Sequence, residues 1–102
     1  MTVIEFKLTM PGRSSWDGGW SGDGGNFTLV REVDDASAAK LDGGSWTYSW
    51  PDGWRAHIHA RAIPAGSQHE KSDGFRGYDW MAASILRYGT IYADHERPEV
   101  TA

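Results

Sequence analysis

A strict alternation of side-chain types between positions 45 and 63 constrains the fold of this chain more than any other feature. From Ser45 to Trp50, three aromatic residues alternate with three small hydroxylated residues. After Pro51-Asp52-Gly53 the alternation resumes from Trp54 to Ile63, with small apolar residues on one side and arginine and histidine on the other. Successive side chains of a strand point to opposite faces, and Pro and Gly favour tight turns. The pattern therefore predicts a β-hairpin whose apolar face pairs large rings with small side chains.

Two further strands are expected earlier in the chain. Residues 2–10 and 26–33 both alternate apolar and polar side chains, and Pro11-Gly12 ends the first of these stretches. The first stretch is expected to be half-buried. Its predicted core face consists of Ile4, Phe6, Leu8 and Met10, and its predicted outer face of Val3, Glu5, Lys7 and Thr9.

Two helices are expected. Residues 34–41 predict a short one, because Asp34 can cap its first turn and Gly43 can end it. From Tyr78 the apolar residues recur with helical spacing, and Gly89 is the stop signal. Trp80 lies off this apolar stripe, so it either covers the preceding loop or is exposed. Residues 90–93 suit a short last strand, and residues 94–102 are expected to form a frayed tail.

These elements predict one α+β domain over residues 1–102. The expected order is strand, strand, helix, strand, strand, helix, strand. We predict a small antiparallel sheet of four to five strands, with the second helix packed on one face.

The composition excludes several function classes. The chain has no cysteine, which rules out disulfides and thiolate metal sites and suits a reducing cytoplasm. No stretch approaches the ~20 apolar residues of a membrane span, and the first residues do not resemble a signal peptide. A net charge of −4 is unfavourable for direct nucleic-acid binding. We expect a cytoplasmic protein with neither a membrane nor a nucleic acid as its partner.

Six tryptophans in 102 residues are the second unusual feature. Trp16 and Trp20 lie in a glycine-rich stretch, and Trp50 and Trp54 flank the predicted turn. Such rings are either the main mass of a small core or an aromatic recognition surface. The glycine-rich stretch matches no phosphate-binding motif, which leaves a loop held by two rings or a stacking platform as its interpretations.

The outer face of the returning strand is cationic, and it consists of Arg55, His57, His59 and Arg61. The two histidines are expected about 7 Å apart. With a third ligand such as His69, Asp73 or His95 they could bind Zn²⁺ or another divalent metal. The flanking arginines oppose a cation and suit an anion or an acidic partner instead. An ordinary solvated face is the remaining alternative, and we expect neither a metal nor a cofactor.

Signals for catalysis are weak. The chain has no nucleophile elbow and no His-Glu-x-x-His motif, and nothing in the spacing singles out His57 with Asp73 or Glu70 as an acid–base pair. We therefore expect a protein that is not an enzyme. A metal-assisted hydrolase that uses His57 and His59 stays as a further alternative.

Three segments together resemble a known group of proteins. They are Met10-Pro11-Gly12 with Trp16 and Trp20, then Asp52-Gly53-Trp54, then Gly74-Phe75-x-Gly77-Tyr78-Asp79-Trp80-Met81 with Ile85 and Gly89. This combination resembles a family of short bacteriophage and prophage proteins, most of them without an assigned function, and the similarity spans most of the chain. The resemblance brings no catalytic motif. Small phage accessory proteins of this kind commonly inhibit bacterial immunity by binding, and anti-CRISPR proteins are the best-known class.

The resemblance implies a phage-encoded inhibitor that acts in the cytoplasm of the host bacterium, most simply an anti-CRISPR protein that occludes a Cas protein or effector complex. The alternative is an aromatic and arginine-lined site that sequesters a nucleotide immune signal. Tryptophan, tyrosine and arginine dominate binding hot spots. The expected contact residues are Trp16, Trp20, Trp50, Trp54, Arg55, His57, His59, Arg61, Arg76 and Trp80.

Overall fold

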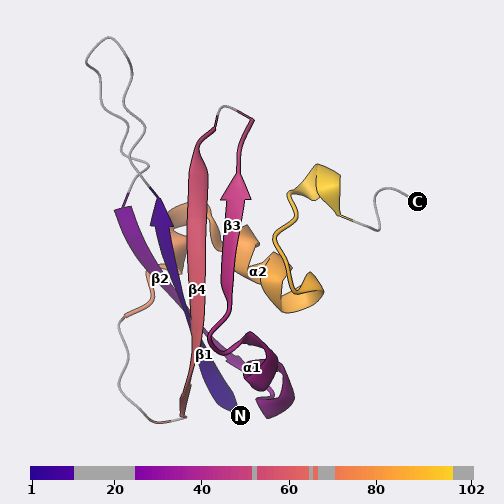
Figure 1. Cartoon of the computed structure of the whole chain (residues 1–102). Helices are drawn as coiled ribbons and strands as arrows, with labels where there is room; N and C mark the ends of the chain where they lie inside the picture. The colour runs from indigo at the N-terminus through magenta and orange to yellow at the C-terminus, as the bar shows by residue number, and fades with distance from the viewer. Residues whose placement is uncertain (11–24, 52, 65, 67–70, 98–102) are drawn as a thin grey trace.

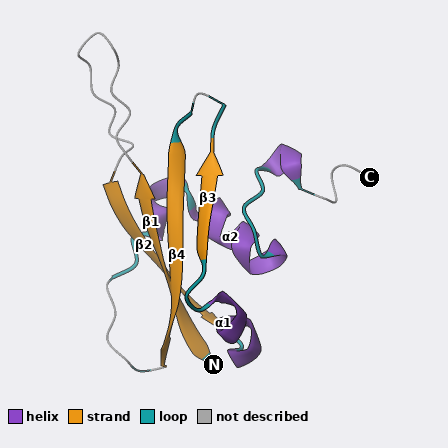
Figure 2. Cartoon of the chain, viewed as in Figure 1, coloured by secondary structure: helices purple, strands orange, loops and turns teal. Residues whose placement is uncertain are grey.

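The computed structural model describes residues 1–10, 25–51, 53–64, 66 and 71–97 of the chain. These residues form a small α+β domain, as the sequence predicts (Figures 1 and 2). Its elements are β1 (Thr2–Met10), β2 (Gly25–Val33), α1 (Asp35–Leu41), β3 (Ser45–Ser49), β4 (Arg55–Pro64), the 3₁₀ turn η1 (Gly74–Gly77), α2 (Asp79–Tyr88) and the 3₁₀ turn η2 (Asp94–Glu96).

The four strands form one antiparallel sheet in the order β2-β1-β4-β3. The two longest pairings join β1 to β2 and β1 to β4, so β1 lies in the interior of the sheet (Figure 1). Met10 pairs with Gly25, and Ser49 pairs with Arg55. The register of β1 with β4 places both of these pairs at the same end of the sheet. The last residues of β1 and β3 therefore lie at the same end of the sheet as the first residues of β2 and β4.

The helices cover one face of the sheet, and the core lies between them and the strands (Figure 2). The predicted core face of β1 is buried throughout, and the alanine and isoleucine face of β4 packs beside it. In α2 the buried side chains include Met81, Ala82 and Ile85, which confirms the predicted apolar stripe. Leu86 lies outside that stripe and is 37% exposed.

Phe75 closes this core from the turn that precedes α2. Its ring is fully buried and meets Phe6 edge to face at 6.5 Å. Its backbone has a φ of 61°, a region that side chains other than glycine rarely adopt. The carboxylate of Asp73 fixes this turn, because it accepts hydrogen bonds from the backbone N–H groups of Thr28 and Phe75. The segment is thus a packed turn joined to β2.

The prediction for the outer face of β1 is wrong at Val3 and Glu5, which are both buried. Neighbours on both sides flank β1, so their side chains cover this face as well as the core face. Arg61, directly opposite on β4, forms an ion pair with Glu5 at 2.8 Å between Nε and Oε1. Thr9 is exposed, as expected.

The chain after α2 also differs from the prediction. Residues 90–93 form no strand, because they are held by the helix instead of by the sheet. The buried hydroxyl of Ser84 donates to the carbonyl oxygen of Thr90 and accepts from the N–H of Tyr92, both at 2.7 Å. Where a frayed tail was expected, residues 94–96 form η2. Residues 98–102 lie outside the described part of the chain.

Candidate functional site

Five aromatic side chains gather at the end of the sheet where β3 turns into β4. They come from the end of β3, the turn that follows it and the start of α2. We call them the aromatic cluster, and its members are Tyr48, Trp50, Trp54, Tyr78 and Trp80. All five are half-buried and pack against the edge of the core. Each of these residues therefore keeps part of its surface in contact with solvent.

The β3–β4 turn brings Trp50 and Trp54 together. The N–H of Trp50 donates to the carbonyl oxygen of Trp54 at 2.8 Å, and the N–H of Gly53 donates back to Trp50 at 2.9 Å. The two indole centroids lie 4.6 Å apart with their planes tilted by 35°. Tyr78 stands 6.2 Å from both rings. Gly53 has a φ of 90°, so the predicted turn indeed requires a glycine at this position.

Strand alternation places Tyr48 in the cluster as well. Its partner across the ladder is Ala56, whose small side chain leaves room for a large ring. Tyr48 contacts Trp50 at 5.0 Å and Trp80 at 5.5 Å. Trp80, which the sequence left between two interpretations, therefore covers the hairpin and remains partly exposed.

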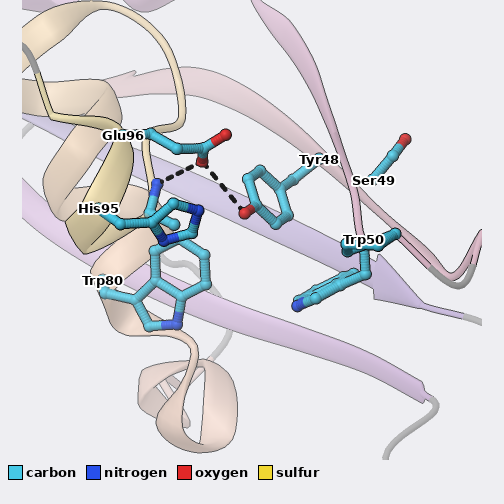
Figure 3. A pocket seen from close by; sticks show the side chains of 8 residues that line it. Tyr48, Ser49, Trp50, Trp80, His95 and Glu96 are labelled. Atoms are coloured by element: carbon cyan, nitrogen blue, oxygen red, sulfur yellow. Dashed lines mark hydrogen bonds between the residues drawn. The ribbon is translucent and has the colours of Figure 1, made fainter.

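A pocket of about 370 Å³ opens beside the cluster (Figure 3). It is lined by Tyr48, Ser49, Trp50, Pro51, Trp80, Ala93, His95 and Glu96. The hydroxyl of Tyr48 donates to Oε1 of Glu96 at 3.1 Å, and the N–H of Ala93 donates to the same oxygen at 2.9 Å. Burial raises the pKa of Tyr48, and the hydrogen bond and negative charge of Glu96 raise it further. One wall of the pocket is thus aromatic and another carries a carboxylate.

A second pocket, of about 320 Å³, lies between α1, the start of β3 and the end of α2. It is lined by Ser37, Lys40, Leu41, Trp46, Ile85, Leu86, Arg87 and Gly89. Trp46 borders it and donates from Nε1 to the carbonyl oxygen of Gly89 at 2.9 Å. That hydrogen bond joins β3 to the C-terminal end of α2, so Trp46 has a structural role.

The cationic face of β4 forms as predicted, with its arginines and histidines all exposed. Strand alternation puts this face on the side of the sheet opposite the aromatic cluster. His57 Nδ1 lies 3.1 Å from the hydroxyl of Thr47, and Arg61 is held by Glu5. The predicted contact residues therefore divide into two separate surfaces.

The predicted metal and acid–base arrangements gain no support from the described residues. Among them, no three His, Asp or Glu side chains are grouped closely enough to bind a metal ion. Asp73 hydrogen-bonds the backbone of β2, and β1 separates that strand from His57 on β4. The pair of His57 with Asp73 is therefore not formed. His69 and Glu70 lie outside the described residues.

Three other predicted contact residues have no described side chain: Trp16, Trp20 and Arg76. Conversely, the sequence did not indicate Tyr48 or Glu96 as site residues, and it indicated His95 only as a possible metal ligand. Tyr48 alternates in step with Trp50 and so shares its face of the hairpin, and this pattern could have indicated it as a site residue. No local pattern indicates that Glu96 meets Tyr48, because the two are 48 residues apart.

Comparison of the chain with protein-family models, curated proteins and solved structures finds no match. None of the helices described here is long and apolar enough to cross a membrane.

Proposed function

We propose that this protein acts by binding another protein through the aromatic cluster. The observation that carries the proposal is the position of five half-buried rings at one corner of a sheet whose own core is complete. Tryptophan and tyrosine are enriched in binding hot spots, because each buries a large area at little entropic cost.

The core does not depend on the exposed parts of these rings. Phe6, Ile58 and Met81 are fully buried between the sheet and α2, whereas the cluster lies at the periphery. A ring of the cluster can therefore contact a partner without any rearrangement of the fold. Removal of a central hot-spot ring typically lowers affinity by ~2 kcal/mol or more.

The resemblance to short phage and prophage proteins supports the choice of partner. We propose that the protein is a phage-encoded inhibitor of a bacterial defence system, and that it occludes a Cas protein or effector complex. This part of the proposal rests on that resemblance alone.

The nucleotide-sequestering alternative has less support from the geometry. It needs aromatic rings and arginines around one ligand, yet Arg55 and Arg61 lie on the face of the sheet opposite Trp50 and Trp54. Calorimetry with cyclic nucleotides tests it directly, since saturable heat would favour sequestration over occlusion of a protein.

The decisive experiment is an interference assay in bacteria that carry a defined CRISPR-Cas system, together with capture of the effector complex on the purified protein. The wild-type protein is expected to restore infection by a targeted phage and to retain the complex. Trp50→Ala and Trp54→Ala should lose both effects while remaining folded.

His59→Ala is the matched control, because His59 is exposed on the opposite face of the same hairpin. If His59→Ala abolishes binding and the tryptophan variants do not, the contact surface is the cationic face. If the wild-type protein neither protects phages nor retains any effector complex, the proposed partner class is wrong.

A further inference from the structure

The pocket beside the aromatic cluster has the composition of an aromatic cage. Cages of this kind surround an organic cation with electron-rich ring faces. We propose that Tyr48, Trp50, Trp80 and Glu96 form a binding site for a methylated ammonium group, such as that of a trimethylated lysine side chain or a choline-type molecule. The proposal refines the binding surface proposed above by naming the chemistry that one part of it takes.

Three rings of the pocket wall pack edge to face against one another. Tyr48 is nearly perpendicular to both tryptophans, at 85° to Trp50 and 90° to Trp80. Figure 3 shows the two indoles on either side of Tyr48, with Glu96 at its hydroxyl end. A cation within ~6 Å of a ring centroid is attracted by the negative face of that ring. All three residues line the pocket, so a cation held there lies beside more than one aromatic side chain.

The charge of the pocket favours a cation over an anion. Glu96 lines the pocket and brings a carboxylate to it, and the hydrogen bonds from Tyr48 and Ala93 both end on Oε1. The raised pKa of Tyr48, caused first by burial and then by Glu96, is consistent with a negative field at this wall. None of the described lining residues is a lysine or an arginine, and His95 is the one lining side chain that can become cationic.

The carboxylate wall is fixed by the fold. Ser84 holds Thr90 and Tyr92 against α2 through two hydrogen bonds of 2.7 Å. The chain then turns through η2, where Ala93 and Tyr48 both donate to Glu96. Two independent tethers therefore place the carboxylate beside the rings, so little ordering entropy is lost when a ligand enters.

The pocket is also of suitable size. Its volume of about 370 Å³ lies at the lower end of the range for small-molecule sites. That volume suits a compact trimethylammonium group with part of its stem.

The test is a titration of the isolated protein, followed by the indole N–H signals of Trp50 and Trp80 in two-dimensional NMR. The probes are choline chloride, a short peptide with a trimethylated lysine, the same peptide unmethylated, and 3,3-dimethylbutanol, the uncharged isostere of choline. We expect saturable shifts with the methylated cations and at least tenfold weaker binding of the isostere. Comparison of the affinities for choline and for the trimethyl-lysine peptide shows which of the two carries the cation that the site prefers.

Two variants complete the test. Glu96→Gln keeps the shape of the side chain but removes its charge, and it should weaken binding of the cation several-fold without affecting the isostere. Trp80→Leu should weaken binding of the cation about tenfold or more. Trp46→Phe, at the other pocket, should not change the affinity for the cation.

Equal affinity for choline and its isostere, or an unchanged affinity in Glu96→Gln, would overturn the proposal in favour of a plain apolar pocket. Absence of any saturable shift would also overturn it. Because no macromolecular partner is used, each of these three failures leaves the proposed occlusion of a defence protein standing.

Discussion

Glu5 and Arg61 lie directly opposite each other on the two inner strands of the sheet, with 2.8 Å between Oε1 and Nε. Their environments differ sharply, because the Glu5 side chain is fully buried whereas that of Arg61 is 63% exposed. The second carboxylate oxygen of Glu5 is buried and has no hydrogen bond. Among the described contacts, Arg61 compensates for burying this carboxylate, so it cannot be treated as a free binding residue.

We expect Arg61→Met to lower the free energy of unfolding by about 1–3 kcal/mol, because it leaves a buried acceptor without its partner. Urea denaturation measures this. Arg55→Met is the matched control on the same face of β4 and should change stability by no more than ~0.5 kcal/mol. Adding Glu5→Leu to Arg61→Met should recover most of the loss, since apolar replacement of a buried pair is often neutral. Equal effects of the two arginine substitutions would show that the ion pair contributes nothing.

Gly44 and the ring of Trp46 lie in close steric contact. A Cβ atom built on Gly44 would overlap Cη2 of the Trp46 ring, and it would also press on the carbonyl oxygen of Leu41. We expect Gly44→Ala to destabilise the fold by about 1–3 kcal/mol through overpacking, as measured by thermal or urea unfolding.

A smaller ring tests the cause of that loss. In a Trp46→Phe background Gly44→Ala should cost clearly less, although Trp46→Phe alone removes the hydrogen bond to Gly89 at a cost of about 1 kcal/mol. Ser45→Ala, at an exposed neighbouring position, is the control and should be close to neutral. An identical cost of Gly44→Ala in both backgrounds would contradict a clash with the indole.

Tyr48 is expected to make stability fall at alkaline pH. Its pKa is raised in the folded protein, first by burial and then by Glu96, whereas an unfolded tyrosine ionises near ~10. The folded state therefore holds its proton when the unfolded state has begun to lose it. The contribution of Tyr48 to stability is complete below the pKa of the unfolded tyrosine. It is lost as the pH rises through the pKa of Tyr48 in the folded protein.

Tyrosinate absorbance during a pH titration measures this. Glu96→Gln should lower the pKa of Tyr48, but not to its ordinary value, because burial is the largest cause. Tyr48→Phe should remove one late-titrating group from the curve. If Tyr48→Phe instead removes a group that titrates at or below the ordinary pKa, the described environment of this ring is wrong.

The hairpin and the cluster could be predicted to the extent that side-chain alternation encodes them. Residues 45–63 alternate strictly, and the period of two directly determines which side chains share a face. The burial of Glu5 could not be predicted, because it depends on the pairing of β1 with a strand more than fifty residues away. The same holds for the contact of Phe75 with Phe6, because the two residues lie far apart in the sequence. Some contacts depend on the order of the strands in the sheet, or on a distant segment of the chain packing against it. Such contacts leave no local pattern in the sequence.

Ser84 provides one of the two tethers of the segment that carries Glu96. Ser84 is 4% exposed, and its hydroxyl is the only described group that bonds both the carbonyl oxygen of Thr90 and the N–H of Tyr92. Ser84→Ala leaves both backbone groups without this partner, so we expect a loss of about 1–3 kcal/mol in the free energy of unfolding. We also expect faster hydrogen exchange at the Tyr92 amide, because the segment can then open locally without global unfolding. Ala83→Ser, at the exposed neighbouring position of α2, should leave exchange at Tyr92 unchanged. If the Tyr92 amide stays equally protected in Ser84→Ala, the hydroxyl does not hold the segment, and the position of Glu96 must come from its bonds to Ala93 and Tyr48 alone.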